Sequence, residues 1–358
     1  MPENGGEMAV PSISDGPESM IVTTLGMFII DENQYPESWN RKTEHNIVGG
    51  GGPYAIVGAR IIAGAKYGTR VSGIIDKGSD FPDSVQNQLS SWQSGIVFRE
   101  DPTRLTTRGI NKYDENDIRH FEYKTPKKRI EVEDILEFPV LRSSKCFHLI
   151  CSIDRCDSII SLLNEKLDHK PVYIYEPLPD DCVAENFEKL TKLLPKVHIF
   201  TPNLDEACAL SGVKELPSTT NGLQEVSSRF KKYLKLDNSG TILRCGALGC
   251  YIHTLEDYRI LLPAYHTDQN KVIDVTGGGN SFCGGCIAGF FLSGGNWLIA
   301  GISGNLASGC VIERLGMPGK DAESEEWNGL TLSERIDVYF KNNSDLLQSS
   351  DRSSFSWI

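Results

Sequence analysis

The chain has 358 residues, with 48 acidic and 36 basic side chains and a formal net charge of −12 at pH 7. At roughly 100–200 residues per domain, this length allows one large α/β domain or two smaller domains. With 39% hydrophobic and 23% charged residues, the composition excludes disordered, collagen-like and coiled-coil proteins. Nucleic acid is an unexpected partner for so acidic a chain, because affinity for it comes largely from Lys and Arg.

Two segments bear on localisation. Residues 1–19 are polar, lack the pattern of a secretory signal, and are expected to form a flexible arm. Residues 275–312 contain no charged side chain, but Gly294-Gly295-Asn296 divides them into halves shorter than the roughly 20 apolar residues of a membrane span. We therefore expect two buried helices and no membrane contact. The expected location is the cytoplasm, with the nucleus as an alternative.

The first elements alternate between strand and helix. Residues 20–30 are apolar and rich in β-branched side chains, which predicts one buried strand that ends at Asp31. A run of four glycines, 49–52, then precedes a helical pattern over 55–66. Residues 69–75 read as the next strand and 81–92 as the next helix.

An excursion from the main sheet is predicted around residues 105–123. β-type residues flank a polar turn at 113–117, which is typical of a half-exposed hairpin. Strand and helix patterns then alternate to the end of the chain. Strands are expected at 146–151, 172–175, 197–201, 241–245 and 249–253, and the later helices at 280–292, 297–314 and 332–341. This alternation predicts an α/β fold with a mainly parallel sheet covered on both faces. The Ser-rich residues 344–358 are predicted to be a mobile tail.

The segment Asp274-Val-Thr-Gly-Gly-Gly-Asn280 carries the clearest chemistry. It places three glycines between a strand end and a helix start. There, converging N–H groups and the helix dipole favour an anion. A turn that serves only helix–sheet packing is the alternative. Cys283 and Cys286 form a CxxC pair, but no second pair or histidine pair accompanies it, so buried reduced thiols are expected.

The order of these motifs over about residues 20–315 resembles the PfkB or ribokinase family of ATP-dependent small-molecule kinases. Within that family, the pattern is most similar to a fungal, killer-maintenance-like subgroup with GGGN in place of GAGD. The resemblance implies a ribokinase-like three-layer α/β fold over residues 20–343. It also implies a small β-lid built from about 33–47 and 95–125, through which two copies could pair as a homodimer.

The resemblance further implies ATP as cosubstrate, Mg²⁺ as cofactor, and a sugar, nucleoside or vitamin-like alcohol as acceptor. The residues expected at the acceptor and at the transferring phosphate are Asp31, Gly51 and Gly52 for the acceptor, Gly277, Gly278 and Gly279 for the anion hole, and Asn280 at the position of the family's base. The residues expected to organise ATP and Mg²⁺ are Arg244, Gly246, Gly249 and Asn305 for ATP, and Asn203 and Glu206 for Mg²⁺ through water. Helix capping by Asn203 and Glu206, and plain helix packing by Asn305, are the alternatives.

Three departures from the family pattern limit the functional prediction. Asn280 replaces an Asp, and an amide cannot supply the general-base catalysis that is typically worth about 10²–10⁴ in rate. Ala55 stands where a sugar-binding Asn is usual, and Tyr54 is bulkier than the family's residue. A slow kinase, a pseudokinase that only binds nucleotide, and a structural protein all remain open. Activity that appears on Asn280→Asp would favour the pseudokinase.

Overall fold

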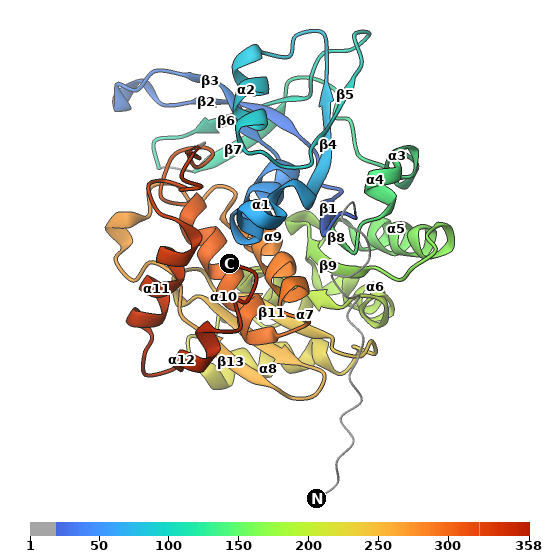
Figure 1. The fold of residues 1–358 in the computed structure, drawn as a ribbon, viewed down its shortest axis with the longest axis vertical. Helices are drawn as coiled ribbons and strands as arrows, with labels where there is room; N and C mark the ends of the chain where they lie inside the picture. Colours follow the sequence, from blue (N-terminus) through green and yellow to red (C-terminus); the bar gives the residue numbers. More distant parts are fainter. Residues whose placement is uncertain (1–18, 117, 322) are drawn as a thin grey trace, which may run out of the picture.

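A nine-stranded sheet separates two helical layers (Figure 1). The computed structural model describes residues 19–116, 118–321 and 323–358. From edge to edge, the large sheet consists of β13 (Arg259–Leu262), β12 (Cys250–Thr254), β11 (Gly240–Arg244), β10 (Ile199–Phe200), β9 (Val172–Pro177), β8 (Cys146–Cys151), β1 (Val22–Thr24), β4 (Val71–Lys77) and β5 (Val97–Glu100). All neighbours from β5 to β11 pair in parallel, and β12 alone runs in the opposite direction, since it pairs antiparallel with both β11 and β13. The predicted mainly parallel sheet is confirmed.

Both faces of this sheet are buried, as expected when helices cover a parallel sheet on each side. Successive residues of β8 and β9 alternate between two hydrophobic cores, with Cys146 and Ile174 in one and Phe147 and Tyr173 in the other. The helices that pack on the first core are α1 (Gly51–Tyr67), α2 (Asp83–Ser91), α9 (Gly278–Leu292), α10 (Trp297–Val311) and α11 (Leu332–Asn342), with α12 (Ser349–Arg352) against α11. The helices that pack on the second core are α3 (Val132–Glu137), α4 (Pro139–Arg142), α5 (Ile153–Lys166), α6 (Phe187–Leu193), α7 (Leu204–Ser211) and α8 (Thr220–Lys231).

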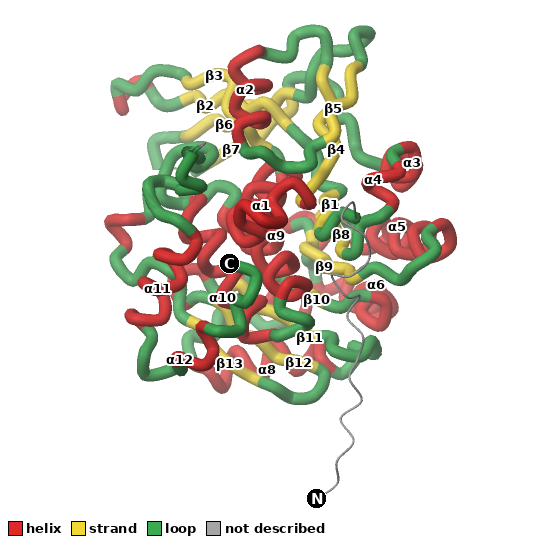
Figure 2. Tube along the Cα trace, in the orientation of Figure 1, coloured by secondary structure: helices red, strands yellow, loops and turns green. Residues whose placement is uncertain are grey.

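A second, four-stranded sheet stands apart from the large one, at the top of the view in Figure 2. Its strand order is β3 (Glu44–Gly49), β2 (Ile29–Gln34), β6 (Arg108–Tyr113) and β7 (Arg119–Tyr123). The predicted hairpin is present as the antiparallel pair of β6 and β7. The expected lid segment 95–125 begins too early, because β5 pairs with β4 at the edge of the large sheet.

The prediction of one buried strand ending at Asp31 is wrong. The run divides into β1 in the large sheet and β2 in the small sheet, and Asp31 lies within β2. The chain crosses between the sheets at Gly26, which packs against the start of α1. A Cβ on Gly26 would lie 2.5 Å from the backbone nitrogen of Gly52. This close approach requires glycine at position 26. It also places the beginning of the small sheet next to the start of α1.

The ends of the chain also differ from the prediction. Of the expected arm 1–19, residues 1–18 lie outside the described residues, while the backbone oxygen of Ser19 accepts a 2.6 Å hydrogen bond from Arg70. The tail predicted to be mobile is packed. Phe355 and Trp357 are 2% and 5% exposed, because both insert against the core beside α1 and α11. Within the described ranges, no helix is both long and apolar enough to cross a membrane.

Candidate active site

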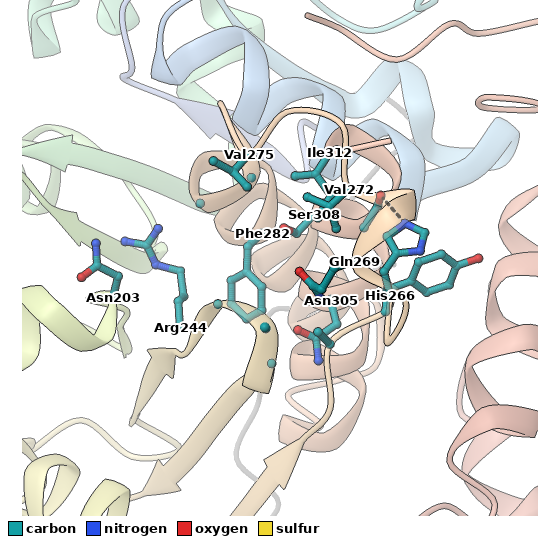
Figure 3. A pocket seen from close by; sticks show the side chains of 18 residues that line it. Asn203, Arg244, His266, Gln269, Val272, Val275, Phe282, Asn305, Ser308 and Ile312 are labelled. Atoms are coloured by element: carbon teal, nitrogen blue, oxygen red, sulfur yellow. Dashed lines mark hydrogen bonds between the residues drawn. The ribbon is translucent and has the colours of Figure 1, made fainter. Parts of the chain in front are cut away.

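A cavity of about 310 Å³ lies beyond the end of β11, between the starts of α7 and α9 and the middle of α10 (Figure 3). Parallel sheets commonly bind ligands at the carboxyl ends of their strands. The predicted site residues that line this cavity are Asn203, Arg244, Gly246, Gly249, Gly278, Gly279 and Asn305. The residues assigned to ATP and phosphate from separate motifs therefore meet at one cavity.

The start of α9 forms one end of this cavity, where the sequence predicts an anion hole. Gly277 precedes the helix in the left-handed conformation, with φ 76°. A Cβ there would also lie 2.1 Å from the ring of Tyr54, so this position requires glycine twice over. The first N–H groups of a helix have no intrahelical acceptor. The N–H of Gly278 donates to the backbone oxygen of Val275 at 3.1 Å, so it is the first turn beyond it, starting at Gly279, that turns its N–H groups and the positive end of the helix dipole to the cavity.

Asn280 is anchored by a buried carboxylate. Its Nδ2 donates a 2.9 Å hydrogen bond to Oε2 of Glu176, which lies at the end of β9 and is 4% exposed. The same oxygen lies 3.0 Å from Nε2 of His148, and the other oxygen, Oε1, lies 3.0 Å from Nη1 of Arg244. Because Nδ2 is used in this way, the amide oxygen of Asn280 is left as the group that can accept a hydrogen bond from a ligand.

Glu176 stays ionised although it is buried. Burial raises its pKa, but the charge of Arg244 and the hydrogen bonds from His148 and Asn280 lower the pKa to about 2. The position of the family's base therefore holds a neutral amide that faces a permanent negative charge. A second carboxylate at this position would lie next to the first.

His148 supports Glu176 from the far side. Gly26 N–H donates to Oγ1 of Thr24, and this hydroxyl lies 2.9 Å from Nδ1 of His148. A ring that carries its proton on Nε2 satisfies both contacts, since it accepts from Thr24 and donates to Glu176. Cys283 Sγ lies within 4.8 Å of the ligand atoms of both residues. In this structure His148 and Glu176 use these atoms in hydrogen bonds with each other, with Thr24 and with Asn280.

The pair expected to organise Mg²⁺ forms a capping box at the start of α7. Asn203 Oδ1 accepts from the Glu206 N–H, and Glu206 Oε2 accepts from the Asn203 N–H, both at 2.8 Å. Glu206 Oε2 also lies 3.3 Å from Nη2 of Arg244. The guanidinium of Arg244 thus pairs with both Glu176 and Glu206 near the start of α9. This donor set is a poor match for a divalent cation held directly by the protein.

Asn305 lies in the cavity wall, but its amide is already used. Its Nδ2 donates to the backbone oxygen of Pro263 at 2.9 Å and lies 3.2 Å from the hydroxyl of Tyr339. These bonds tie α10 to the end of β13 and to α11, which matches the packing alternative. Gly246 and Gly249 form a turn with φ 55° and 93°, and this turn lets the backbone line the cavity.

The residues predicted to bind the acceptor lie on the other side of the α9 start. The carboxylate of Asp31 lies directly over Gly49, where a Cβ would come within 2.0 Å of Oδ2, and a Cβ on Gly51 would lie 3.4 Å from Nδ2 of Asn280. The short segment 49–51 thus joins the surroundings of Asp31 to those of Asn280. Asp31 Oδ1 is buried without a hydrogen-bond partner among the described residues. A ligand hydroxyl is the group that such an oxygen lacks.

A second cavity, of about 780 Å³, adjoins this acceptor side. The small sheet contributes the aromatic side chains of Tyr35, Trp39 and Tyr113, and the loop 272–277 forms the opposite wall. Val272 and Val275 line both cavities. The two cavities therefore meet at the loop that leads into α9.

Comparison with known proteins agrees with this geometry. The model of the "pfkB family carbohydrate kinase" matches residues 113–321, which is more than half of the chain. The chain belongs to the pfkB family. Protein MAK32 of Saccharomyces cerevisiae is 37% identical over 337 residues, which cover 89% of this chain and 92% of that protein. The predicted family, and the resemblance to its fungal killer-maintenance-like members, are confirmed.

Solved structures confirm the ribokinase-like fold of this pfkB-family chain. Ribokinase from Giardia lamblia aligns with a TM-score of 0.66 and 15% identity, and the alignment covers 91% of this chain and all of that structure. An Escherichia coli protein in complex with ATP and Mg²⁺ aligns with a TM-score of 0.63 and 16% identity, covering 90% of this chain and 100% of the other. At this level of identity, the comparison establishes the fold alone.

Glu176 is the main residue that sequence reasoning missed. It follows the apolar stretch Val172–Tyr175 directly, and an acidic residue at the carboxyl end of a buried parallel strand is a recognisable signal in an α/β fold. His148 gave no comparable signal, because it lies within an apolar strand and resembles a packed core residue.

Asp31→Asn should stabilise the protein near neutral pH while weakening its acceptor site. Burial raises the pKa of Asp31 to about 6, although the charge of Arg119 and the amide of Asn111 partly oppose this. A carboxyl whose pKa is higher in the folded state loses stability as pH rises from about 4 to 6. The gain for Asn should therefore be small near pH 4 and on the order of 3 kcal/mol at pH 7.

Urea unfolding at pH 4 and pH 7.5 would measure this difference. Glu122→Gln on the exposed strand β7 is the matched control and should show no such gain. An Asp31→Asn variant that is less stable than wild type at pH 7.5 would mean that the native carboxylate makes favourable contacts and is not held at a cost.

Proposed function

We propose that this protein transfers a phosphoryl group from ATP to a hydroxyl of a small molecule. The observation that carries the proposal is the arrangement of two cavities on either side of the loop 272–277, with the glycine-rich start of α9 at their boundary. A nucleotide in the first cavity would direct its terminal phosphate toward Gly278 and Gly279. An acceptor beneath the small sheet would approach the same point from the side of Asp31.

The residues would act mainly by position and charge. The acceptor oxygen would attack the γ-phosphorus while the bond to the bridging oxygen breaks and ADP leaves. Phosphoryl transfer passes through a loose transition state, so positioning and electrostatic stabilisation account for most of its catalysis. Asp31 would orient the acceptor, the glycine N–H groups would stabilise the equatorial oxygens, and the amide oxygen of Asn280 would align the attacking hydroxyl. Without a carboxylate base at position 280, turnover would be slow.

A second function, nucleotide binding without turnover, is favoured by one specific contact. The Asn280 amide donates to Glu176 and is therefore part of the buried hydrogen-bond network. A residue fixed in that network stabilises the fold even where no transfer occurs. In this case the protein would be a nucleotide-dependent binding protein that retains a kinase fold.

The two functions are separated by ADP formation measured across sugars, nucleosides and vitamin-like alcohols. Acceptor-dependent ADP release by the wild-type chain would establish the transferase. Saturable ATP binding with no acceptor-dependent release would establish the binding protein instead. Failure to bind ATP would contradict both.

Gly279→Val should abolish stabilisation by ATP. A Cβ on Gly279 would lie 2.1 Å from Nη1 of Arg244, so the branched side chain would fill the phosphate position and displace the guanidinium. The smaller Gly279→Ala should retain part of the effect, because the end of a flexible arginine can shift. The measurement is the ATP-induced rise in melting temperature, and an undiminished rise in the valine variant would place the phosphates elsewhere.

A further inference from the structure

One face of the small sheet carries both the carboxylate of Asp31 and a pair of stacked rings. Residues two positions apart on a strand point to the same face, so Asp31 shares its face with Tyr35, which directly follows β2. On β6, Gly109 is paired with Asp31, and Tyr113 lies on the same face four positions further along. The rings of Tyr35 and Tyr113 stack with centroids 5.3 Å apart. The carboxylate therefore lies at one end of this face and the rings at the other.

These rings belong to a preformed aromatic wall of the second cavity. Trp39, in the turn between β2 and β3, lies with its ring 5.9 Å from Tyr35 and 6.3 Å from Tyr113, and all three residues line the cavity. The planes of Tyr113 and Trp39 differ from that of Tyr35 by only 22° and 26°, so the wall is nearly flat. The guanidinium of Arg41 packs 4.0 Å over the Tyr35 ring. Because the rings are already ordered, little conformational entropy is lost when a ligand stacks on them.

The wall opposite these rings exposes aliphatic side chains. Ile273 and Val275, on the loop 272–277, are 62% and 73% exposed and are the two most exposed large hydrophobic residues in the described part of the chain. Leu315 adds a third aliphatic side chain to the same cavity. Apolar surface that is concentrated at a cavity indicates a ligand site, because covering it with an apolar group removes it from water. A flat, apolar group is the part of a ligand that fits between these two walls.

The distance along the sheet limits the size of this ligand. Four residues separate Asp31 from Tyr35, and at about 3.3 Å per residue the two positions lie roughly 13 Å apart. A single sugar ring is shorter than this span. The charge of Arg119, which lines the cavity, partly opposes the rise in the pKa of Asp31, so the cavity lies within electrostatic reach of the carboxylate. One ligand that uses both ends must therefore have a second part beyond its hydroxylated part.

We propose that the acceptor is a hydroxyl-bearing aromatic compound with two parts. Asp31 orients the reacting hydroxyl of the first part, and the planar ring of the second part stacks between the aromatic wall and the loop 272–277. Free monosaccharides are then poor acceptors. The inference rests on the proposed function for the transfer itself and deepens it by naming the chemical class of the acceptor. A second copy of this chain that covers the same rings is the competing occupant.

Calorimetric titration of the full chain with matched pairs of compounds tests the proposal. Each pair shares its hydroxylated part and differs in one ring: the methyl and phenyl glycosides of ribose, of glucose and of fructose. We expect the phenyl compound of at least one pair to bind about tenfold more tightly or better, as one well-stacked and buried ring allows. Equal binding within every pair, or no binding of any phenyl compound, would overturn the inference.

ADP formation with the same compounds separates this inference from the proposed function. Equal rates with methyl and phenyl glycosides would overturn the inference and leave the transferase intact. Phenyl-selective binding without ADP formation would support the aromatic ligand class and contradict the transferase.

Variants of Trp39 test the aromatic wall directly, and they should fold because this side chain is only half-buried. Trp39→Ala should reduce the preference for the phenyl compound to less than about threefold, whereas Trp39→Phe, which keeps a ring, should retain most of it. Tyr258→Ala is the matched control, since Tyr258 is 41% exposed in the turn between β12 and β13. It should leave the preference unchanged.

Two results would show that the proposal is wrong. The first is a phenyl preference that persists undiminished in W39A, because the rings would then not contact the ligand. The second comes from sedimentation: a wild-type dimer that W39A dissociates, together with no phenyl preference, would make the rings an interface between two copies.

Discussion

Asn280→Asp alone should not increase ADP formation, whereas N280D/E176Q should increase it by up to about 10²–10⁴-fold, the usual contribution of a general base. The reason is the 2.9 Å contact between Asn280 Nδ2 and Glu176 Oε2. A carboxylate introduced at position 280 would face an ionised, buried carboxylate. When two carboxylates share a site, the charge of one raises the pKa of the other, so one of them keeps its proton.

The single variant should also be less stable. Glu176 is held ionised by Arg244 and His148, so the new carboxyl is the one that stays protonated at pH 7. Each unit by which its pKa is raised costs about 1.4 kcal/mol of differential interaction. A protonated carboxyl cannot take the proton from the attacking hydroxyl. Restoring the family's Asp at position 280 alone should therefore not restore general-base catalysis.

N280D/E176Q reverses the direction of the hydrogen bond between positions 176 and 280, and so removes the repulsion between two carboxylates. A glutamine at position 176 can donate to a carboxylate at position 280, and Arg244 keeps Glu206 as its partner. Glu176→Gln alone is the control, because it leaves an amide at position 280 and should show no such increase. Melting temperatures and ADP formation would be measured on all four proteins. Faster turnover in N280D than in N280D/E176Q would contradict the role assigned to Glu176.

This coupling shows where sequence reasoning reached its limit. The glycine-rich start of α9 was predictable, because strand end, glycines and helix start are consecutive in the chain. Glu176 and Asn280 are separated by 104 positions. Only the pairing of β8 with β9 and the packing of α9 on these strands bring the two residues together.

The same reason explains the errors in the fold prediction. Residues 20–30 show one continuous apolar and β-type pattern, because strands of both sheets bury such residues. The change of sheet at Gly26 depends on a backbone contact with Gly52, which no local pattern reports. The segment from residue 344 was predicted to be mobile because serines and charged residues dominate its composition. The two buried aromatic residues that anchor it, Phe355 and Trp357, are a small minority of its residues. Periodic helices such as α9 and α10 were placed within a few residues.

Trp357→Ala should lower the free energy of unfolding by about 3–5 kcal/mol, as expected for truncation of a large buried aromatic residue. The ring packs against Phe355 with centroids 5.2 Å apart, and its Nε1 donates a 2.9 Å hydrogen bond to the backbone oxygen of Ile62. This oxygen lies just before the break in α1 at Gly64, where φ is 61° and the helical hydrogen-bond pattern is interrupted. The tail therefore satisfies an acceptor that the helix itself leaves open.

Urea unfolding of two further variants separates packing from hydrogen bonding. Trp357→Phe keeps most of the ring and should lose only about 1 kcal/mol, the usual net value of one hydrogen bond. Ile358→Ala is the control, because its side chain is 51% exposed, and it should change stability by less than about 0.5 kcal/mol. Equal stability of W357A and I358A would mean that the tail detaches in solution. A large loss confined to W357A would establish that the C-terminal residues are part of the layer that holds α1, and with it the glycine segment between Asp31 and Asn280.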